Sequence, residues 1–311
     1  MSNNHFYNRD IVSIRDFSRQ DLEYIFSATD KISALKPNEK SDLGKGRILG
    51  YIFYEPSTRT RMSFEAAMAS LGGSSIGIFD SKSSSIEKGE SLADTIRIMD
   101  LYSDVIILRH MLDGSSRFAG ELSRNPIINA GSGSEEHPTQ AMLDLYTIFK
   151  EKGRIDNLNI GIVGDLKYGR TVYSLLYGLK NYNVNLYLVS PPSLGIRKES
   201  IFEFEAYMNI TNYHFLDEVI PHLDVLYVTR IQKERFPDTQ EYEKVKGTYR
   251  IDEKIVDNAK TDLSIMHPLP RLDEISHTID YTTNAIYFKQ AAYGKELRSA
   301  LLALVLNENP F

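Results

Sequence analysis

Hydrophobic residues in the first half follow two alternating patterns, one typical of helices and one typical of buried strands. Ser18 and Asp21 have the spacing of a capping box, and the apolar residues after them recur on one helical face. The run 48–54 is short, apolar and bounded by a proline, which indicates a buried strand. From Thr58 the apolar spacing becomes helical again, until a pair of glycines predicts the end of the helix.

The alternation continues along the chain and restarts after a polar connection. Further strands are predicted at residues 74–79, 105–108, 127–129, 160–163, 185–189, 225–228 and 263–266, with helical segments between them. Strands that alternate with helices favour parallel sheets. We therefore predict an α/β fold of two domains, residues 1–150 and 151–311, each a mainly parallel sheet flanked by helices. A last helix, at about residues 290–307, is expected to pack back on the first domain.

Composition and charge narrow the classes of function. The 311 residues fit two domains of about 150 residues each. A net charge of −6 argues against a broad nucleic-acid-binding face, so an anionic ligand must meet a locally basic site. The absence of cysteine excludes disulfides, thiolate metal sites and cysteine nucleophiles. Because no apolar run approaches the length of about 18 residues that a membrane span needs, we expect no membrane interaction and a cytoplasmic location.

The segment 55–61, Glu-Pro-Ser-Thr-Arg-Thr-Arg, joins the first predicted strand to the helix that follows. A helix N-terminus offers unpaired N–H groups and the positive end of the helix dipole to an anion. Ser57, Thr58 and Thr60 add hydroxyl donors, and the guanidinium of Arg59 fits two phosphate oxygens. A simple helix cap with solvated arginines is the alternative, but two arginines in a first turn oppose the dipole. The segment predicts a phosphate site.

Two more polar segments follow strands in the same half. Arg109 comes directly after the strand 105–108, where a cation faces the ligand crevice of an open parallel sheet. A Gly/Ser-rich loop then leads to His137 and Gln140, which are spaced to share one helical face. Separately, Arg109 could form a surface ion pair and His137 could cap a helix. Three loops of this kind at one sheet edge favour a single anion site.

The run 53–61, together with His137-Pro138-Thr139-Gln140, resembles the carbamoyl-phosphate-binding signature of the transcarbamoylase family. The resemblance extends over essentially the whole sequence. It implies that the first domain binds carbamoyl phosphate through Ser57, Thr58, Arg59, Thr60, Arg109, His137 and Gln140. It further implies that catalysis depends on Arg59, Thr60, Arg109 and His137, without a metal or another cofactor. The leaving phosphate is the expected proton acceptor, with His137 as the alternative base.

In the second half, the run Gly161-Ile162-Val163-Gly164-Asp165 follows a predicted strand but lacks the G-x-G-x-x-G spacing of a dinucleotide fold. Arg170 and Arg230 lie at separate strand ends. Two guanidinium groups that converge on one crevice can clamp the two carboxylates of a dicarboxylate substrate. Each arginine alone could equally be an ordinary surface residue.

These segments, with Met266-His267-Pro268-Leu269-Pro270-Arg271, resemble the aspartate branch of the family. The ornithine branch carries a cysteine in a His-Cys-Leu-Pro motif, which this chain lacks. The resemblance therefore implies transfer of a carbamoyl group to L-aspartate, the second step of pyrimidine biosynthesis, by an aspartate-binding second domain. It assigns Lys167, Arg170, Arg230 and Gln232 to substrate binding, with Pro268 and Leu269 closing over both substrates. Another acceptor, such as ornithine, and a catalytically silent subunit remain as alternatives.

The family resemblance also implies partners. Its members form homotrimers with shared active sites, sometimes joined to regulatory chains, and borrow a serine and a lysine from a neighbouring subunit. Ser84 and Lys88 match these two positions, in a Ser-rich loop that could otherwise be a flexible surface connection. Better-known bacterial members have two adjacent lysines here, where this chain has Glu87-Lys88.

Overall fold

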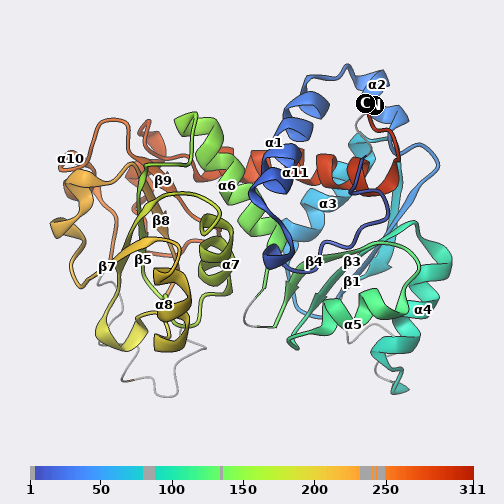
Figure 1. Cartoon of the computed structure of the whole chain (residues 1–311), viewed down its shortest axis with the longest axis horizontal. Coiled ribbons are helices and arrows are strands. Elements are labelled where there is room, and N and C mark those ends of the chain that lie inside the picture. The colour runs from blue at the N-terminus through green and yellow to red at the C-terminus, as the bar shows by residue number, and fades with distance from the viewer. Residues whose placement is uncertain (1–3, 80–87, 134–135, 232–239, 241–242, 244–248) are drawn as a thin grey trace. The chain divides into compact units, whose positions relative to one another are not determined.

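The computed structural model describes residues 4–79, 88–133, 136–231, 240, 243 and 249–311. The chain divides into two compact units, one comprising Met1–Leu143 and Ala292–Phe311 and the other Asp144–Ala291. Each unit contains a sheet whose strand pairs are all parallel among the described residues, with helices packed against it (Figure 1). The predicted α/β fold with two parallel sheets is confirmed.

In the first unit the sheet has the strand order β2-β1-β3-β4. Its strands are β1 (Ile48–Phe53), β2 (Ser74–Ile78), β3 (Val105–His110) and β4 (Ile127–Ser132). Helix α3 (Thr58–Ser70) contacts β1 and β2, whereas α4 (Leu92–Tyr102) contacts β1 and β3, and α5 (Ser115–Leu122) contacts β3 and β4. Successive β1 residues face opposite layers. Tyr51 lies under the Arg61 guanidinium of α3, and a Cβ on Gly50 would come within 2.6 Å of Met99 in α4.

The first unit begins with α1 (Arg19–Ala34) and α2 (Pro37–Asp42). The predicted capping box is confirmed, because the Ser18 side chain accepts from the Asp21 backbone N–H and the Asp21 carboxylate accepts from the Ser18 N–H. Short 3-10 helices occur at Ile14–Asp16, Pro192–Leu194, Leu216–Glu218, Ile220–His222 and His277–Tyr281.

In the second unit the strand order is β7-β6-β5-β8-β9. The strands are β5 (Asn159–Val163), β6 (Asn185–Val189), β7 (Asn209–Tyr213), β8 (Val225–Val228) and β9 (Ser264–Met266). The helices are α6 (Pro138–Lys152), which begins in the first unit, α7 (Arg170–Leu179), α8 (Lys198–Glu205) and α10 (Glu253–Asp257). The sequence did not predict β7, because this edge strand, Asn-Ile-Thr-Asn-Tyr, is polar and largely exposed.

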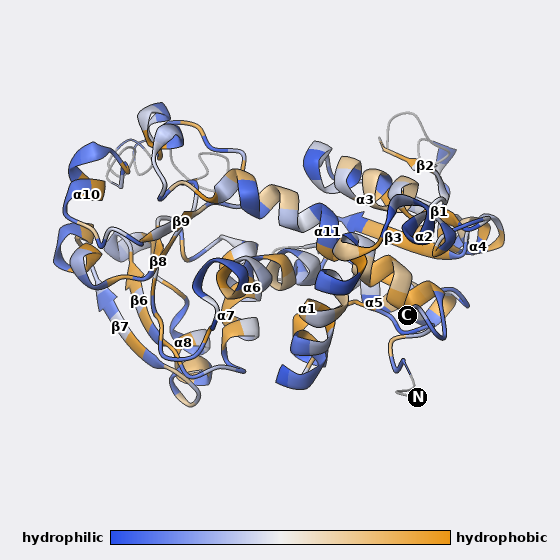
Figure 2. Ribbon diagram, turned by 90° about the horizontal axis from the view of Figure 1, so that it is seen from above, coloured by the Kyte–Doolittle hydropathy of each residue, from blue (hydrophilic) through white to orange (hydrophobic). Residues whose placement is uncertain are grey.

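The last helix, α11 (Tyr287–Leu306), returns to the first unit as predicted. The Arg298 guanidinium donates to the Ser63 hydroxyl and lies 4.9 Å from the Phe64 ring centroid, both in α3. The side chain of Asn307 donates to the Leu43 carbonyl at 2.9 Å, beyond α2. Figure 2 shows hydrophobic residues concentrated in strands and along parts of the helices, with hydrophilic residues at many helix ends and loops. Among the described residues, no helix is long and apolar enough to cross a membrane.

Candidate functional site

The first group of predicted site residues lies at the carboxyl ends of β1, β3 and β4, which are neighbours in the sheet. Strand β3 extends beyond the predicted 105–108 and includes Arg109, and β4 extends through Ser132. Parallel strands end at the same sheet edge, so the three loops emerge side by side. Because it belongs to the strand, the Arg109 backbone is held by the sheet rather than by a loop.

Arg109 links all three strand ends. Its side chain is buried, with 8% of its residue surface exposed. Its Nη1 donates to the Ala130 carbonyl of β4 at 2.9 Å, and its Nη2 pairs with Glu55 Oε2 at 3.3 Å in the loop after β1. The Arg109 carbonyl accepts from the Tyr54 N–H at 2.9 Å. Glu55 lies in the segment 55–61, but the sequence does not indicate its role, because its partner Arg109 is distant in the chain.

The two arginines at the start of α3 have different surroundings. Arg61 pairs with Glu65 at 3.9 Å and lies 5.1 Å from the Phe79 ring centroid, so it packs against its own unit. Arg59 is exposed, and Thr60 between them is buried. Ser57 is the N-cap residue, but among the described residues its side chain makes no capping hydrogen bond. The simple-cap alternative therefore finds no support at Ser57, while Thr58 is exposed beside it.

His137 and Gln140 are both buried at the start of α6. The His137 carbonyl accepts from the Gln140 N–H at 3.0 Å and from the Ala141 N–H at 3.2 Å, so this histidine ends the loop and opens the helix. His110, which follows Arg109 in β3, makes a hydrogen bond with the backbone. Its Nδ1 accepts from the Leu112 N–H at 3.0 Å. Burial lowers the pKa of His110.

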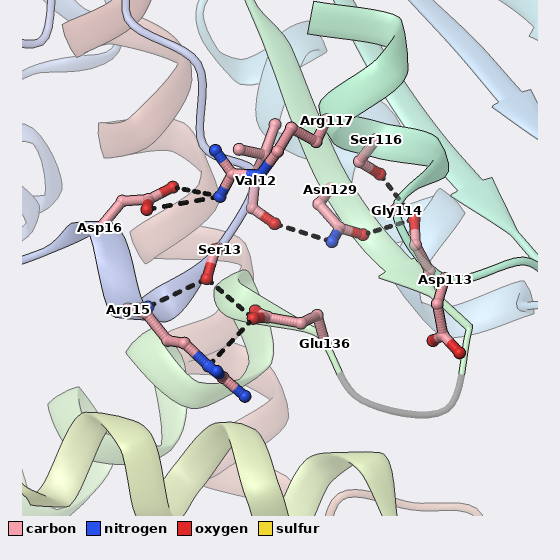
Figure 3. Close-up of a pocket in the computed structure, with 11 residues that line it drawn as sticks. Val12, Ser13, Arg15, Asp16, Asp113, Gly114, Ser116, Arg117, Asn129 and Glu136 are labelled. Carbon is pink, nitrogen blue, oxygen red and sulfur yellow. Dashed lines mark hydrogen bonds and ion pairs between the residues drawn. The ribbon is translucent and has the colours of Figure 1, made fainter.

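The residue before His137 anchors this loop to the N-terminal segment (Figure 3). Glu136 accepts from the Ser13 hydroxyl at 2.7 Å and from the Ile14 N–H at 3.3 Å, and it pairs with Arg15 at 3.7 Å. Burial raises the pKa of Glu136, although these hydrogen bonds oppose the shift. A cavity of about 270 Å³ lies here. Its lining includes Glu136 but none of the predicted phosphate residues, so it is distinct from the predicted site.

The second group lies at the carboxyl ends of β5, β8 and β9, which are also neighbours. After β5, Asp165 Oδ1 accepts from the Lys167 N–H at 3.1 Å and the Tyr168 N–H at 2.9 Å, which fixes the turn before α7. Gly164 has φ +117°, and a Cβ there would lie 2.4 Å from the Thr229 carbonyl oxygen. A glycine is therefore required at position 164, because the ends of β5 and β8 approach each other closely there.

Arg170 is the first residue of α7, and Arg230 follows Thr229 beyond β8. Both arginines are half-buried, as is Lys167, whose Nζ lies 5.1 Å from the Tyr168 ring centroid. The topology thus places the ends of two adjacent strands, each with its arginine, at one edge of the second sheet.

The loop after β9 is organised by His267, which is buried. Its Nδ1 accepts from the Leu269 N–H at 2.8 Å, so the proton lies on Nε2, which donates to Glu274 at 2.8 Å. Burial alone would raise the pKa of Glu274, but the bonds from His267 and the Leu272 N–H lower it below its ordinary value. Pro268 and Leu269 are half-buried, and Leu269 has φ +48°.

Three further residues were predicted to take part in substrate binding. Ser84 and Gln232 lie outside the described residues. Lys88 is exposed ahead of α4. Within the described part of the chain, no group of three or more His, Asp or Glu side chains could hold a metal ion.

Comparison with protein families agrees with the division into two units. Residues 9–150 match the carbamoyl-phosphate-binding domain of the aspartate/ornithine carbamoyltransferases, and residues 156–305 match their aspartate/ornithine-binding domain. The chain is 62% identical over 308 residues to the aspartate carbamoyltransferase catalytic subunit of Nitrosopumilus maritimus, covering 99% of this chain and 100% of that protein. It is 52% identical over 301 residues to that of Thermococcus kodakarensis, covering 96% and 97%.

Solved structures show the same likeness. The catalytic subunit of M. jannaschii aspartate transcarbamoylase aligns with a TM-score of 0.89 at 50% identity, covering 95% of this chain and 97% of that one. The Trypanosoma cruzi aspartate transcarbamoylase, in complex with carbamoyl phosphate and aspartate, aligns with a TM-score of 0.90 at 40% identity, covering 97% and 98%. On its sequence, its two sheets and these matches, the chain belongs to the aspartate/ornithine carbamoyltransferase family.

Proposed function

We propose that this chain transfers the carbamoyl group of carbamoyl phosphate to the amino group of L-aspartate, giving N-carbamoyl-L-aspartate and phosphate. This reaction is a step of pyrimidine biosynthesis. The observation that carries the proposal is the linkage of three strand ends by Arg109, together with the exposed Arg59 at the N-terminus of α3 after the first of these strands. The N. maritimus and T. kodakarensis relatives, which are named for this activity, support it.

We call the residues expected to bind carbamoyl phosphate the donor half-site: Ser57, Thr58, Arg59, Thr60, Arg109, His137 and Gln140. The guanidinium of Arg59 and the N-terminal end of α3 suit the phosphate dianion. Arg109, Thr60 and His137 are buried, so their fixed dipoles and charge act in a less polar surrounding than water. Because folding already orients these side chains, the reaction requires little further free energy to orient them.

In the proposed reaction, the neutral amine of aspartate attacks the carbonyl carbon and forms the new C–N bond. The carbonyl oxygen becomes negative, and Thr60, Arg109 and His137 would stabilise it, each such donor being worth about 2.7–4 kcal/mol. Collapse breaks the bond to the phosphate oxygen, and the leaving phosphate takes the amine proton. Orientation of the two substrates can contribute roughly 7–11 kcal/mol.

We call the residues expected to bind aspartate the acceptor half-site: Lys167, Arg170, Arg230, Gln232, Pro268 and Leu269. Arg170 and Arg230 can each pair with one carboxylate of a dicarboxylate. Ornithine has one carboxylate and a second ammonium group, which would leave one arginine unpaired and place like charges together. The charge of these residues therefore supports aspartate over ornithine.

For the assembly, we propose a cytoplasmic homotrimer in which Ser84 and Lys88 complete a neighbouring subunit's donor half-site. The resemblance of the loop 81–90 to the family supports this sharing, and an exposed Lys88 is available to a neighbour. The relatives' names as catalytic subunits support association with separate regulatory chains.

An acceptor panel tests the proposed function. Purified protein is supplied with carbamoyl phosphate and either L-aspartate, L-ornithine or another amino acid, and the carbamoylated product is quantified. We expect product with aspartate and at least about a hundredfold lower kcat/KM with ornithine, as for a site whose charged groups are left unpaired by the wrong substrate. Preference for ornithine would move the chain to the other branch of its family. Substrate binding without turnover would favour a silent subunit.

A further inference from the structure

A buried charge in α6 has no part in the proposed reaction. Asp144 is fully buried and lies between Leu143 and Leu145. Burying a carboxylate is costly unless hydrogen bonds compensate for the lost water. Asp144 Oδ2 accepts from the Tyr227 hydroxyl at 2.9 Å, and Oδ1 accepts from Gln290 Nε2 at 2.6 Å. The carboxylate thus joins α6 to β8 and to α11, entirely within the second unit.

The other end of the Gln290 amide continues this network. Gln290 Oε1 accepts from the His267 N–H at 2.9 Å, and His267 Nδ1 accepts from the Leu269 N–H at 2.8 Å. A carboxylate can only accept and a backbone N–H can only donate, so the amide of Gln290 has one possible orientation between them. Asp144 therefore sets the orientation of Gln290, which holds the start of the loop that carries Leu269.

The Tyr227 branch leads to the other part of the acceptor half-site. Tyr227 is buried in β8, shortly before Arg230. Burial and the Asp144 carboxylate raise the pKa of Tyr227 well above its ordinary value, outweighing a hydrogen bond with Thr171 that lowers it. Its hydroxyl therefore remains a donor. Asp144 is bonded directly to β8, which leads to Arg230, and through Gln290 to the loop that carries Leu269.

We propose that Asp144 and Gln290 are positioning residues of the acceptor half-site, holding the end of β8 and the loop after β9 in the relative placement that aspartate binding needs. Neither side chain touches the substrate in this proposal, which rests on the proposed function. Their contribution is to keep two substrate-binding elements at a fixed separation through one buried carboxylate and one oriented amide.

The variant Gln290→Glu tests the amide orientation. It places a second carboxylate at the 2.6 Å contact with Asp144, and two carboxylates at this distance keep a hydrogen bond only while they share a proton. We expect the aspartate KM to rise about tenfold over wild type at pH 8, the scale of one lost buried hydrogen bond. At pH 6 the ratio of variant to wild-type KM should be smaller, because the shared proton is then retained. The exposed substitution Gln20→Glu is the matched control and should leave KM unchanged.

The double variant Asp144→Asn/Gln290→Glu supplies the rescue. The new amide donates to the new carboxylate, which still accepts from the His267 N–H, and the amide oxygen still accepts from Tyr227. The hydrogen bonds are restored with donor and acceptor exchanged, so we expect the aspartate KM to return to within about threefold of wild type. A merely structural loss of packing would not be repaired in this way.

Each variant is also titrated with inorganic phosphate by calorimetry, and phosphate affinity should stay at the wild-type value because the donor half-site lies in the other unit.

If Gln290→Glu does not fold, Gln290→Met replaces it, since it keeps the volume and removes the acceptor of the His267 N–H. An unchanged aspartate KM in the folded variant, a pH-independent ratio for Gln290→Glu or a double variant no better than the single one overturns the proposal. An inactive wild-type protein would instead refute the proposed function.

Discussion

At the scale of single residues, similar side chains have different roles according to their surroundings. Arg59 and Arg61 are two positions apart in α3, yet Arg61 packs on Phe79 and Glu65 while Arg59 is exposed. The sequence showed that two arginines oppose the helix dipole, and the family resemblance assigned the phosphate to Arg59 rather than Arg61. The packing of Arg61 against its own unit is consistent with that assignment.

Replacing Arg59 with alanine should remove the main phosphate contact. We expect kcat/KM for carbamoyl phosphate to fall about 100- to 1,000-fold, as for loss of a group that stabilises developing charge, with an unchanged unfolding midpoint. Steady-state kinetics and thermal unfolding measure both quantities. Arg61→Ala is the matched control and should affect stability more than turnover. Near-normal turnover of Arg59→Ala would remove Arg59 from the donor half-site.

Replacing Arg230 with alanine should act on the other substrate. Loss of a charge-assisted contact with one carboxylate is worth about 1.5–3 kcal/mol, so the aspartate KM should rise roughly 10- to 100-fold. Phosphate affinity should not change, and calorimetry provides that comparison. An aspartate saturation curve identical to wild type would exclude Arg230 from acceptor binding.

At the scale of elements, strand ends and the loops after them carry the described residues of both proposed half-sites, and much of this arrangement was predictable. Short apolar runs predicted the central strands because parallel strands are buried on both faces. The polar edge strand β7 has no such signal and was missed. The roles of Glu55 and Asp144 could not be predicted, since their partners are distant in sequence. A single charge within the apolar run of α6 was the available hint at Asp144.

The loop after β9 makes a prediction about pH. The pKa of Glu274 is lowered in the folded chain, because its bonds from His267 and Leu272 outweigh the effect of burial. Its stabilising contribution is therefore complete above the unfolded pKa of about 4.5 and is lost as the pH falls through the lower folded value. Glu274→Gln should reduce the free energy of unfolding by about 1–3 kcal/mol at pH 7, because the new amide faces the Leu272 N–H donor.

Unfolding of Glu274→Gln and wild type between pH 3 and pH 7 measures this effect, with the exposed neighbour substitution Asp273→Asn as control. The difference between Glu274→Gln and wild type should be constant above about pH 5 and shrink below it. A difference that persists unchanged to pH 3 would contradict the role given to the Glu274 charge.

At the scale of the whole molecule, the proposed function gives one substrate to each unit, and the proposed trimer adds a contribution from a neighbour. Lys88→Ala and Arg59→Ala should each be strongly impaired alone. If the subunits assort randomly at equal amounts, one of the three shared sites in each mixed trimer, or about a quarter of all sites, contains both intact residues and should regain activity. Native mass spectrometry should find a trimer of about 106 kDa, three times the 35.4 kDa of one chain. Verified hybrids without any recovery would argue against shared sites.

The central claim is direct transfer of a carbamoyl group from a donor bound by one unit to an amine bound by the other. The most direct measurement supplies ¹³C-labelled carbamoyl phosphate and ¹⁵N-labelled L-aspartate and follows the products by mass spectrometry. The proposed function predicts one product, N-carbamoyl-L-aspartate carrying both labels, formed in equal amount with phosphate. Phosphate release without the doubly labelled product would contradict it.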